Sequence, residues 1–208
     1  MIIKMLVVGP VMANCFIVGC EETKEAAVID PGADPARILD VIKKNNLTVK
    51  VIMNTHGHVD HVGANRIMKE KTGAQLMIHS LDVPFLDRVA DTAAAWGLDA
   101  EDSPKPDRVL SDGDTVEVGK LSFKVIHTPG HTLGGISLLL NGCVFVGDTL
   151  FAGSIGRTDL PGGDYDTLIR SIRTRLFALP DDTQVLPGHN QKTTIGQEKR
   201  YNPFVRMM

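Results

Sequence analysis

Thr55-His56-Gly57-His58-Val59-Asp60-His61 carries three of the seven histidines of this 208-residue chain, together with one carboxylate. The segment 50–54 precedes it and is typical of a buried strand, whereas 62–71 has the composition of a helix. The histidines are therefore expected on a strand-to-helix turn, where α/β proteins commonly place their sites. Imidazole and carboxylate groups together suit Zn²⁺, Fe and Mn²⁺. The segment thus predicts a metal site.

The same alternation of strands and helices extends outward in both directions. In the first half we expect strands at 2–8, 14–19, 26–30, 49–53 and 76–79, and helices at 35–46 and 62–71. In the second half we expect strands at 116–118, 121–126, 136–140, 144–146 and 185–186, an Asn141-Gly142 hairpin turn, and helices at 164–179 and 195–200. Each half runs from strands through a helix to a strand that leads into a histidine. This order predicts an α/β (α+β) fold in which a sheet from each half packs face to face, with helices outside.

Composition restricts the classes of function. The chain is 43% hydrophobic and 23% charged, as in ordinary globular proteins, and its length suits one domain. The formal net charge is −3 and no dense basic run occurs, so neither nucleic acid nor a membrane is expected as a partner. The three cysteines are too few for a disulfide framework and lie in apolar runs, which fits a cytoplasmic location.

Three further candidate ligands each follow a predicted strand. His131 lies after 121–126, Asp148 after 144–146, and His189 after 185–186. Strand ends at one sheet edge converge in space, so these side chains are expected to meet the histidine segment across a cleft. The complete candidate set is His56, His58, Asp60, His61, His131, Asp148 and His189. Seven ligands exceed the need of one ion and suit two ions about 3.5–4 Å apart that share a carboxylate.

These motifs resemble a known superfamily. His56-Gly57-His58-Val59-Asp60-His61 is similar to the H-x-H-x-D-H signature of the metallo-β-lactamase superfamily, and His131, Asp148 and His189 match its remaining ligand motifs in order. The resemblance implies a four-layer αβ/βα sandwich of two mixed sheets with helices outside. It also implies that one divalent ion is held at His56, His58 and His131, and a second at Asp60, His61 and His189, with Asp148 bridging. Zn²⁺ is the first expectation, with Fe and Mn²⁺ as alternatives.

Within that superfamily, Gly147-Asp148-Thr149-Leu150-Phe151 and Gly156-Arg157 resemble the glyoxalase II family, the hydroxyacylglutathione hydrolases, in its short single-domain bacterial branch. The resemblance implies hydrolysis of small thioesters such as S-lactoylglutathione. Asp60 is then expected to be catalytic, as a ligand that also orients the attacking water species, and Arg157 to bind a substrate carboxylate. Asp159 and Gln191 depart from the family pattern, which has tyrosines there. A single domain over 1–208, without the C-terminal helical domain that grips glutathione, is expected.

Other activities remain open at this point. A site of His56, His131 and Asp148 alone would hold one iron and is typical of a persulfide dioxygenase, in which His58, His61 and His189 would not be ligands. A lactamase, another hydrolase, or a protein that only binds a ligand are further alternatives. The sequence does not decide the oligomeric state.

Four residues near the motifs fall outside the predicted ligand set. Asp30 is expected either to orient a ligand imidazole or to form only an Asp-Pro-Gly turn, and Thr55 is a similar case. His127 precedes His131 by four positions but matches no ligand motif, so a structural or supporting role is expected. His79 lies in an apolar strand and is also expected to be structural.

Overall fold

Two six-stranded sheets form the centre of the molecule in the computed structural model, which describes residues 1–206. The first sheet has the order β1 (Ile2–Val8), β2 (Ala13–Gly19), β3 (Glu25–Ile29), β4 (Thr48–Met53), β5 (Gln75–His79) and β6 (Arg108–Leu110). The second has the order β14 (Thr193–Thr194), β13 (Gln184–Pro187), β10 (Cys143–Gly147), β9 (Ile136–Leu140), β8 (Leu121–His127) and β7 (Thr115–Val118). A small hairpin joins β11 (Leu150–Phe151) to β12 (Ser154–Ile155).

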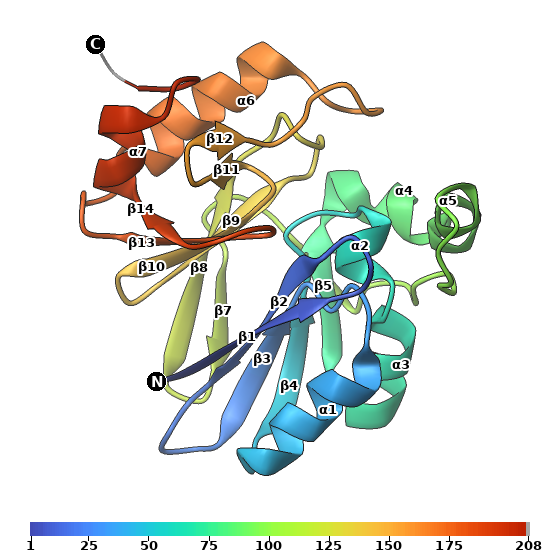
Figure 1. Ribbon diagram of the computed structural model, residues 1–208. Coiled ribbons are helices and arrows are strands. Elements are labelled where there is room, and N and C mark those ends of the chain that lie inside the picture. The colour runs from blue at the N-terminus through green and yellow to red at the C-terminus, as the bar shows by residue number, and fades with distance from the viewer. Residues whose placement is uncertain (207–208) are drawn as a thin grey trace.

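Both sheets are mixed. In the first, β3, β4, β5 and β6 run parallel while β1 and β2 are antiparallel. In the second, β10 and β13 are parallel and the remaining pairs are antiparallel. The candidate ligands lie in the loops that leave the carboxyl ends of β4 in the first sheet and of β8, β10 and β13 in the second, where β8 and β10 point the same way because both are antiparallel to β9. Figure 1 shows these loops meeting between the two halves of the molecule.

Helices cover the outer faces of the sheets (Figure 1). They are α1 (Pro35–Lys44), α2 (Val59–Val62), α3 (Asn65–Thr72), α4 (Val83–Leu86), α5 (Val89–Ala95), α6 (Tyr165–Ser171) and α7 (Ile195–Tyr201). A 3₁₀ turn, Ser80–Asp82, precedes α4, and a π-helical segment, Ile172–Leu176, continues α6. No helix within residues 1–206 has the length and hydropathy needed to cross a membrane.

Of four buried clusters, one packs α2, α4 and α5 against β5, and the other three hold the two sheets and the helices α1, α3 and α6 together. Phe16 from the first sheet and Phe145 from the second meet edge to face at 5.1 Å between ring centroids, at the centre of the inter-sheet core. A second cluster packs Ile38 of α1 and Met68 of α3 against the outside of the first sheet. A third packs Leu168 of α6 against the outside of the second sheet. Burial of these apolar faces gives helix, sheet, sheet and helix in order, which confirms the predicted four-layer αβ/βα sandwich.

The largest disagreement with the sequence prediction concerns the expected helix 62–71. The structure has two helices there, α2 and α3, separated at Gly63 and Ala64. The Ala64 amide donates to the Pro31 carbonyl at 2.9 Å, and a Cβ at Gly63 would lie 2.5 Å from the Gly32 carbonyl oxygen. The turn at 30–32 therefore packs against the chain where a continuous helix would pass. Periodicity within 62–71 carries no information about this contact.

Other elements differ at their ends. The helix predicted at 35–46 ends at Lys44, and the one predicted at 164–179 is α6 followed by the π-helical segment. The short strands β6, β11, β12 and β14 were not predicted, because two or three residues give too little alternation to recognise. The hairpin turn between β9 and β10 is as predicted, with Asn141 at φ 42° and Gly142 at φ 79°, values that suit these residue types.

Candidate metal centre

The histidine segment lies directly after β4, and its backbone is held from several sides. His56 and His58 lie in the loop, and Asp60 and His61 occupy the short helix α2. The side-chain Nδ2 of Asn54, at the start of the loop, donates to the His61 carbonyl at 3.2 Å, which closes the loop on itself. A Cβ at Gly57 would lie 2.6 Å from the Cβ of Phe85, so only glycine fits at this position. The segment is thus a fixed support for side chains.

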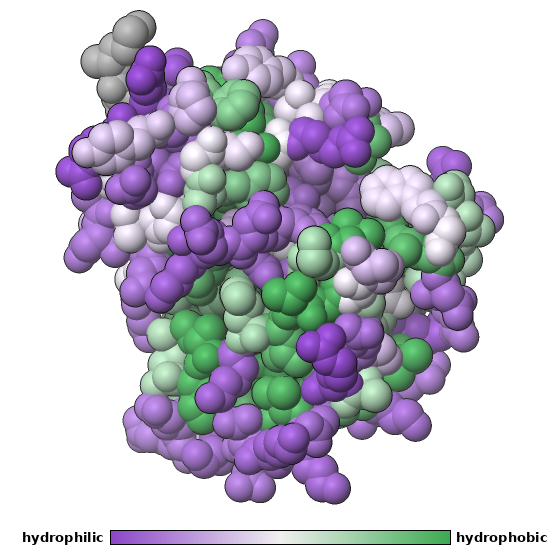
Figure 2. All heavy atoms as spheres, in the orientation of Figure 1, coloured by the Kyte–Doolittle hydropathy of each residue, from purple (hydrophilic) through white to green (hydrophobic). Residues whose placement is uncertain are grey.

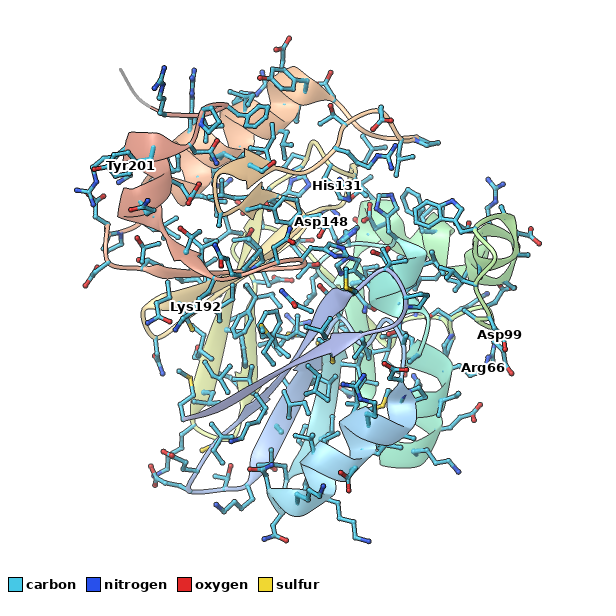
Figure 3. All side chains as sticks on the ribbon, in the orientation of Figure 1. Arg66, Asp99, His131, Asp148, Lys192 and Tyr201 are labelled. Atoms are coloured by element: carbon cyan, nitrogen blue, oxygen red, sulfur yellow. The ribbon has the colours of Figure 1, made fainter. Side chains whose placement is uncertain are left out.

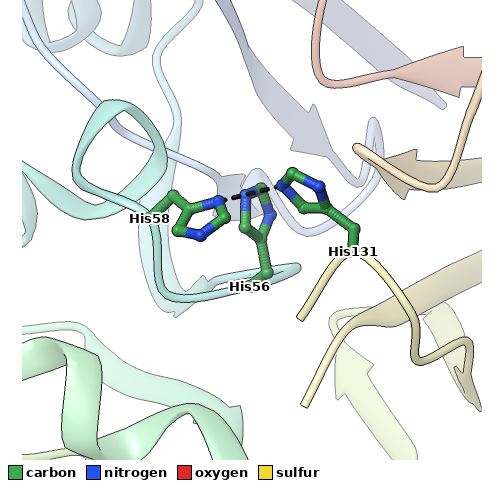
Figure 4. Close-up of side chains that lie close together, drawn as sticks. All are labelled: His56, His58 and His131. Carbon is green, nitrogen blue, oxygen red and sulfur yellow. Dashed lines mark hydrogen bonds between the residues drawn. The ribbon is translucent and has the colours of Figure 1, made fainter. Parts of the chain in front are cut away.

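Three histidines direct nitrogens at one another (Figure 4). His58 Nδ1 lies 2.9 Å from His131 Nε2. His131 Nδ1 donates to the Arg157 carbonyl at 2.8 Å, which leaves its Nε2 as an acceptor. His56 Nδ1 lies 3.1 Å from Thr55 Oγ1, and His56 Nε2 is buried without any hydrogen-bond partner. One nitrogen of each imidazole therefore faces a common point, where a metal ion would take the place of the proton shared by His58 and His131.

A second group consists of Asp60, His61 and His189. His61 Nε2 lies 3.4 Å from Asp60 Oδ2, and His189 Nε2 lies 3.1 Å from the same oxygen. The other ring nitrogens are held from behind: His61 Nδ1 lies 3.1 Å from Asp30 Oδ2, and His189 Nδ1 lies 3.2 Å from the Met12 carbonyl. Donation to these acceptors fixes each ring with Nε2 toward the centre.

Asp148 lies between the two groups. Its Oδ2 is 3.6 Å from both His131 Nε2 and His189 Nε2, and its Oδ1 is 3.5 Å from His61 Nε2. Figure 3 shows Asp148 next to His131, between the two halves of the chain. Oδ1 of Asp148 and Nε2 of His61 are buried without hydrogen-bond partners. Buried polar atoms without partners are rare in proteins, and a pair of cations is a group that these donors fit.

Glycines make room for this arrangement. A Cβ at Gly188 would lie 2.3 Å from Asp148 Oδ1 and 2.7 Å from the Cε1 of His61. Gly147 adopts φ 49°, and a Cβ there would lie 2.2 Å from Thr55 Oγ1. The strands β10 and β13 can therefore deliver their ligands side by side only because these positions have no side chain.

Burial and the neighbouring charges determine the protonation of the ligands. Burial holds the pKa of His56 well below its ordinary value, and burial together with the nearby His131 lowers the pKa of His58 to about 3. Burial opposes the charge of Asp60, but His61 and His189 outweigh it and lower the pKa of that carboxyl. Burial also opposes the charge of His61, but Asp60 and Asp148 outweigh it and raise its pKa. Carboxylates that hold a proton on His61 would equally stabilise a cation at the same place.

All seven candidate ligands named from the sequence meet at this centre. The structure also decides the roles of Asp30 and His127. Asp30 both forms the turn and supports the centre, because its carboxylate accepts from the Thr55 amide at 2.7 Å and from Thr55 Oγ1 at 2.6 Å. His127 does not join the centre. It stacks on His79 with ring centroids 4.4 Å apart and contacts the Leu133 carbonyl.

Arg157 lies at the rim of the centre. Its backbone carbonyl accepts from His131, while its exposed guanidinium pairs with Asp159 through two contacts of 2.8 and 2.7 Å. Sequence reasoning missed two other participants, the carbonyl of Met12 and the buried carboxylate of Asp82. Neither carried a signal, since a backbone carbonyl is independent of residue type and Asp82 lies 25 positions from its nearest contact in the histidine segment.

A cavity of about 430 Å³ adjoins the centre on the side of Asp60. The β1–β2 turn, the start of α1, helices α2 and α3, and residues 97–101 line it. Figure 2 shows apolar side chains gathered over this part of the surface. The region beside the candidate ligands is therefore largely apolar, with charged residues such as Arg66 and Asp99 at its edge.

The model of the metallo-β-lactamase superfamily matches residues 8–189. This chain belongs to that superfamily. The chain is 41% identical to a relative from Haemophilus influenzae described as hydroxyacylglutathione hydrolase GloC, over 98% of this chain and 97% of that one. The crystal structure of BLEG-1 B3 metallo-β-lactamase is 34% identical, with a TM-score of 0.92 over 98% of this chain and 99% of that one. A crystal structure of TTHA1623 in a di-iron-bound form is 38% identical, with a TM-score of 0.89 over 97% and 99%.

Proposed function

We propose that this protein is a binuclear metal-dependent hydrolase of small thioesters, of the hydroxyacylglutathione type. The observation that carries the proposal is the pair of donor groups joined by Asp148, whose carboxylate oxygens lie 3.5–3.6 Å from histidines of both groups. The likeness to a hydroxyacylglutathione hydrolase over nearly the whole of both chains supports the thioester as substrate. The superfamily membership supports hydrolysis as the reaction.

The residues divide between two ions. His56 Nε2, His58 Nδ1 and His131 Nε2 would hold the first ion, and Asp60, His61 Nε2 and His189 Nε2 the second, with Asp148 shared. Two ions held there would supply a water-derived nucleophile at neutral pH and polarise a substrate carbonyl. Zn²⁺ suits this imidazole and carboxylate set, and Fe or Mn²⁺ suits it as well. The di-iron form of a related protein supports two ions per chain.

The protein side chains supply orientation. Asp60 Oδ2 faces both His61 and His189, so this carboxylate is in reach of a water at the centre and is suited to orient it for attack. Arg157 is exposed beside His131, where its guanidinium would hold a substrate carboxylate after leaving Asp159. The rings of Phe85 next to His58 and of Phe151 near His189 flank the centre with apolar surface.

The direct test is turnover of S-lactoylglutathione by metal-replete protein, measured together with metal content. We expect about two ions per chain and hydrolysis that is lost in Asp148→Asn, a variant of the same size that lacks the shared charge. A β-lactam substrate and glutathione persulfide with oxygen serve as comparison reactions. No thioester turnover above that of Asp148→Asn would refute the thioesterase. One iron per chain with oxygen uptake would instead establish the dioxygenase, and turnover of only the β-lactam would establish a lactamase.

A further inference from the structure

A buried carboxylate joins the two loops that carry the first histidine group. Asp82 is fully buried at the end of the 3₁₀ turn that follows β5. Its Oδ2 accepts from the Gly57 amide at 2.9 Å and from the Thr132 hydroxyl at 2.8 Å. Its Oδ1 accepts from the Gly134 amide at 2.7 Å. Three donors from two loops therefore converge on one side chain, which itself belongs to neither loop.

The three contacts lie next to one group of ligands and not the other. Gly57 is the residue between His56 and His58, and Thr132 directly follows His131. The loop after β4 belongs to the first sheet and the loop after β8 to the second, so the carboxylate connects the sheets where the three histidines meet. Asp60, His61 and His189 have no hydrogen bond to Asp82 within residues 1–206.

The loop that follows His131 packs closely against the Asp82 carboxylate. A Cβ at Gly134 would lie 2.6 Å from Asp82 Oδ1, so the loop after His131 can approach only with glycine there. Burial raises the pKa of Asp82, because a charged carboxylate loses its hydration, while the bonds from Thr132, Gly134 and Gly57 act in the opposite direction. A buried carboxylate costs free energy unless donors such as these compensate. An apolar side chain of the same size would leave these three buried donors without partners, so the carboxylate couples the two loops and does more than fill space.

Asp30 provides a parallel on the other side of the centre. Its carboxylate binds Thr55 and lies 3.1 Å from His61 Nδ1, so it orients a ligand of the second group. We infer that Asp82 is a positioning residue that presets His56, His58 and His131, and so controls the affinity of the first metal ion independently of the second. The inference rests on the two-ion centre proposed above, but not on the identity of the substrate.

The test measures the two ions separately. His189→Ala removes a ligand of the second group and leaves the first, whereas His58→Ala does the reverse. In the His189→Ala background we expect Asp82→Asn to lower the affinity for the remaining ion by about 10–100-fold, measured by chelator competition. This is the range typical of residues that support metal ligands. In the His58→Ala background the same substitution should leave the affinity unchanged. Asparagine must turn an N–H toward one of the three donors, so the arrangement of the loops is lost without a change of size.

Two controls separate positioning from a general loss of stability. Asp107→Asn alters a carboxylate that accepts from the Leu76 amide at the opposite end of β5, and it should leave both affinities unchanged. Thr132→Val removes only one donor, so it should lower the affinity for the first ion by a smaller factor than Asp82→Asn. It tests the inference even if Asp82→Asn does not fold. Equal weakening of the ion in both backgrounds, or no weakening in either, would overturn the inference. So would a fall in the melting temperature of metal-free Asp82→Asn with unchanged metal affinities.

The outcomes also distinguish this inference from the proposed function. If the wild-type protein binds no metal, the proposed function fails first. If it binds two ions but does not cleave the thioester, the thioesterase fails while the effect of Asp82 on the first ion is still measured.

Discussion

Nδ1 of His58 lies 2.9 Å from Nε2 of His131, although the two residues are 73 positions apart and follow strands of different sheets. Burial and the proximity of His131 lower the pKa of His58 to about 3, so this imidazole is neutral at physiological pH. Neutral imidazoles are the form that binds metals. The contact therefore brings the two sheets together at a point suited to a cation, and the first prediction concerns it.

Replacing His131 with alanine removes one donor of the first group. We expect His131→Ala to retain about one metal ion per chain and to lose thioester turnover by more than about 100-fold, the upper limit for residues that only support a ligand. Metal analysis after dialysis and steady-state kinetics check this. His127→Ala is the matched control, because His127 stacks on His79 away from the centre and should keep both ions. Equal metal loss in the two variants would contradict the assignment of His131.

Asp30→Asn should destabilise the protein as well as the metal site. The carboxylate accepts from the Thr55 amide, the Thr55 hydroxyl and His61, and an amide leaves at least one of these donors opposite another donor. Breaking a buried charged network typically costs about 3–5 kcal/mol. We expect a loss of that size in the free energy of unfolding, measured by urea denaturation of the metal-free protein, together with weaker binding of the second ion. A stability equal to that of the wild type would show that Asp30 forms only a turn.

Gly188→Ala should disrupt the metal centre without removing any ligand. Its Cβ would meet Asp148 Oδ1 at 2.3 Å and the His61 ring at 2.7 Å, so both ligands must move. We expect metal content below two ions per chain and a loss of turnover. Gly142→Ala is the comparison, since a Cβ there meets nothing within 4 Å and only the positive φ of 79° costs free energy, about 1 kcal/mol. Normal metal content in Gly188→Ala would argue against a close-packed centre.

Arg157 and Asp159 should have opposite effects on substrate binding. The guanidinium pairs with Asp159, so a substrate carboxylate must compete with this partner. We expect Arg157→Gln to raise KM for S-lactoylglutathione about 10-fold with little change in kcat, as loss of one charge-assisted hydrogen bond predicts. Asp159→Asn should lower KM, because it frees the guanidinium. If both variants keep the KM of the wild-type protein, Arg157 does not bind the substrate.

Asp112, whose partners His127 and Arg175 are not candidate ligands, should contribute to stability in a pH-dependent way. Burial alone would raise its pKa, but the His127 amide and Arg175 outweigh this and hold the pKa below its ordinary value. Its stabilisation is therefore complete above the unfolded-state pKa of about 3.9 and is lost as the pH falls through the lower folded-state value. Asp112→Asn should flatten this acid limb of the unfolding free energy of the metal-free protein, and Arg175→Gln should do so in part. An unchanged pH profile in Asp112→Asn would contradict this account.

Much of the centre was predictable because its ligands follow strands. His131, Asp148 and His189 each come just after a buried apolar run, and parallel strands bring such ends to one edge of a sheet. The break between α2 and α3 was not predictable, because the contact that interrupts the helix comes from Gly32, which the local periodicity does not include. The role of Asp30 also required the structure. This residue forms the Asp-Pro-Gly turn and also orients an imidazole, and the second role depends on His61 Nδ1 lying 3.1 Å from its carboxylate.

Local spacing and residue type predicted a metal site, two sheets and seven candidate ligands, because strand patterns and the short histidine motif depend on neighbours in the chain. The tertiary structure decided which nitrogen of His61, His131 and His189 faces the centre, since the oxygens of Asp30, Arg157 and Met12 that hold the opposite nitrogens come from distant segments of the chain. It also decided the place of Asp82, whose partners lie 25 to 52 positions away. Hydrogen bonds of this kind depend on distances between folded loops, and no pattern in the sequence records them.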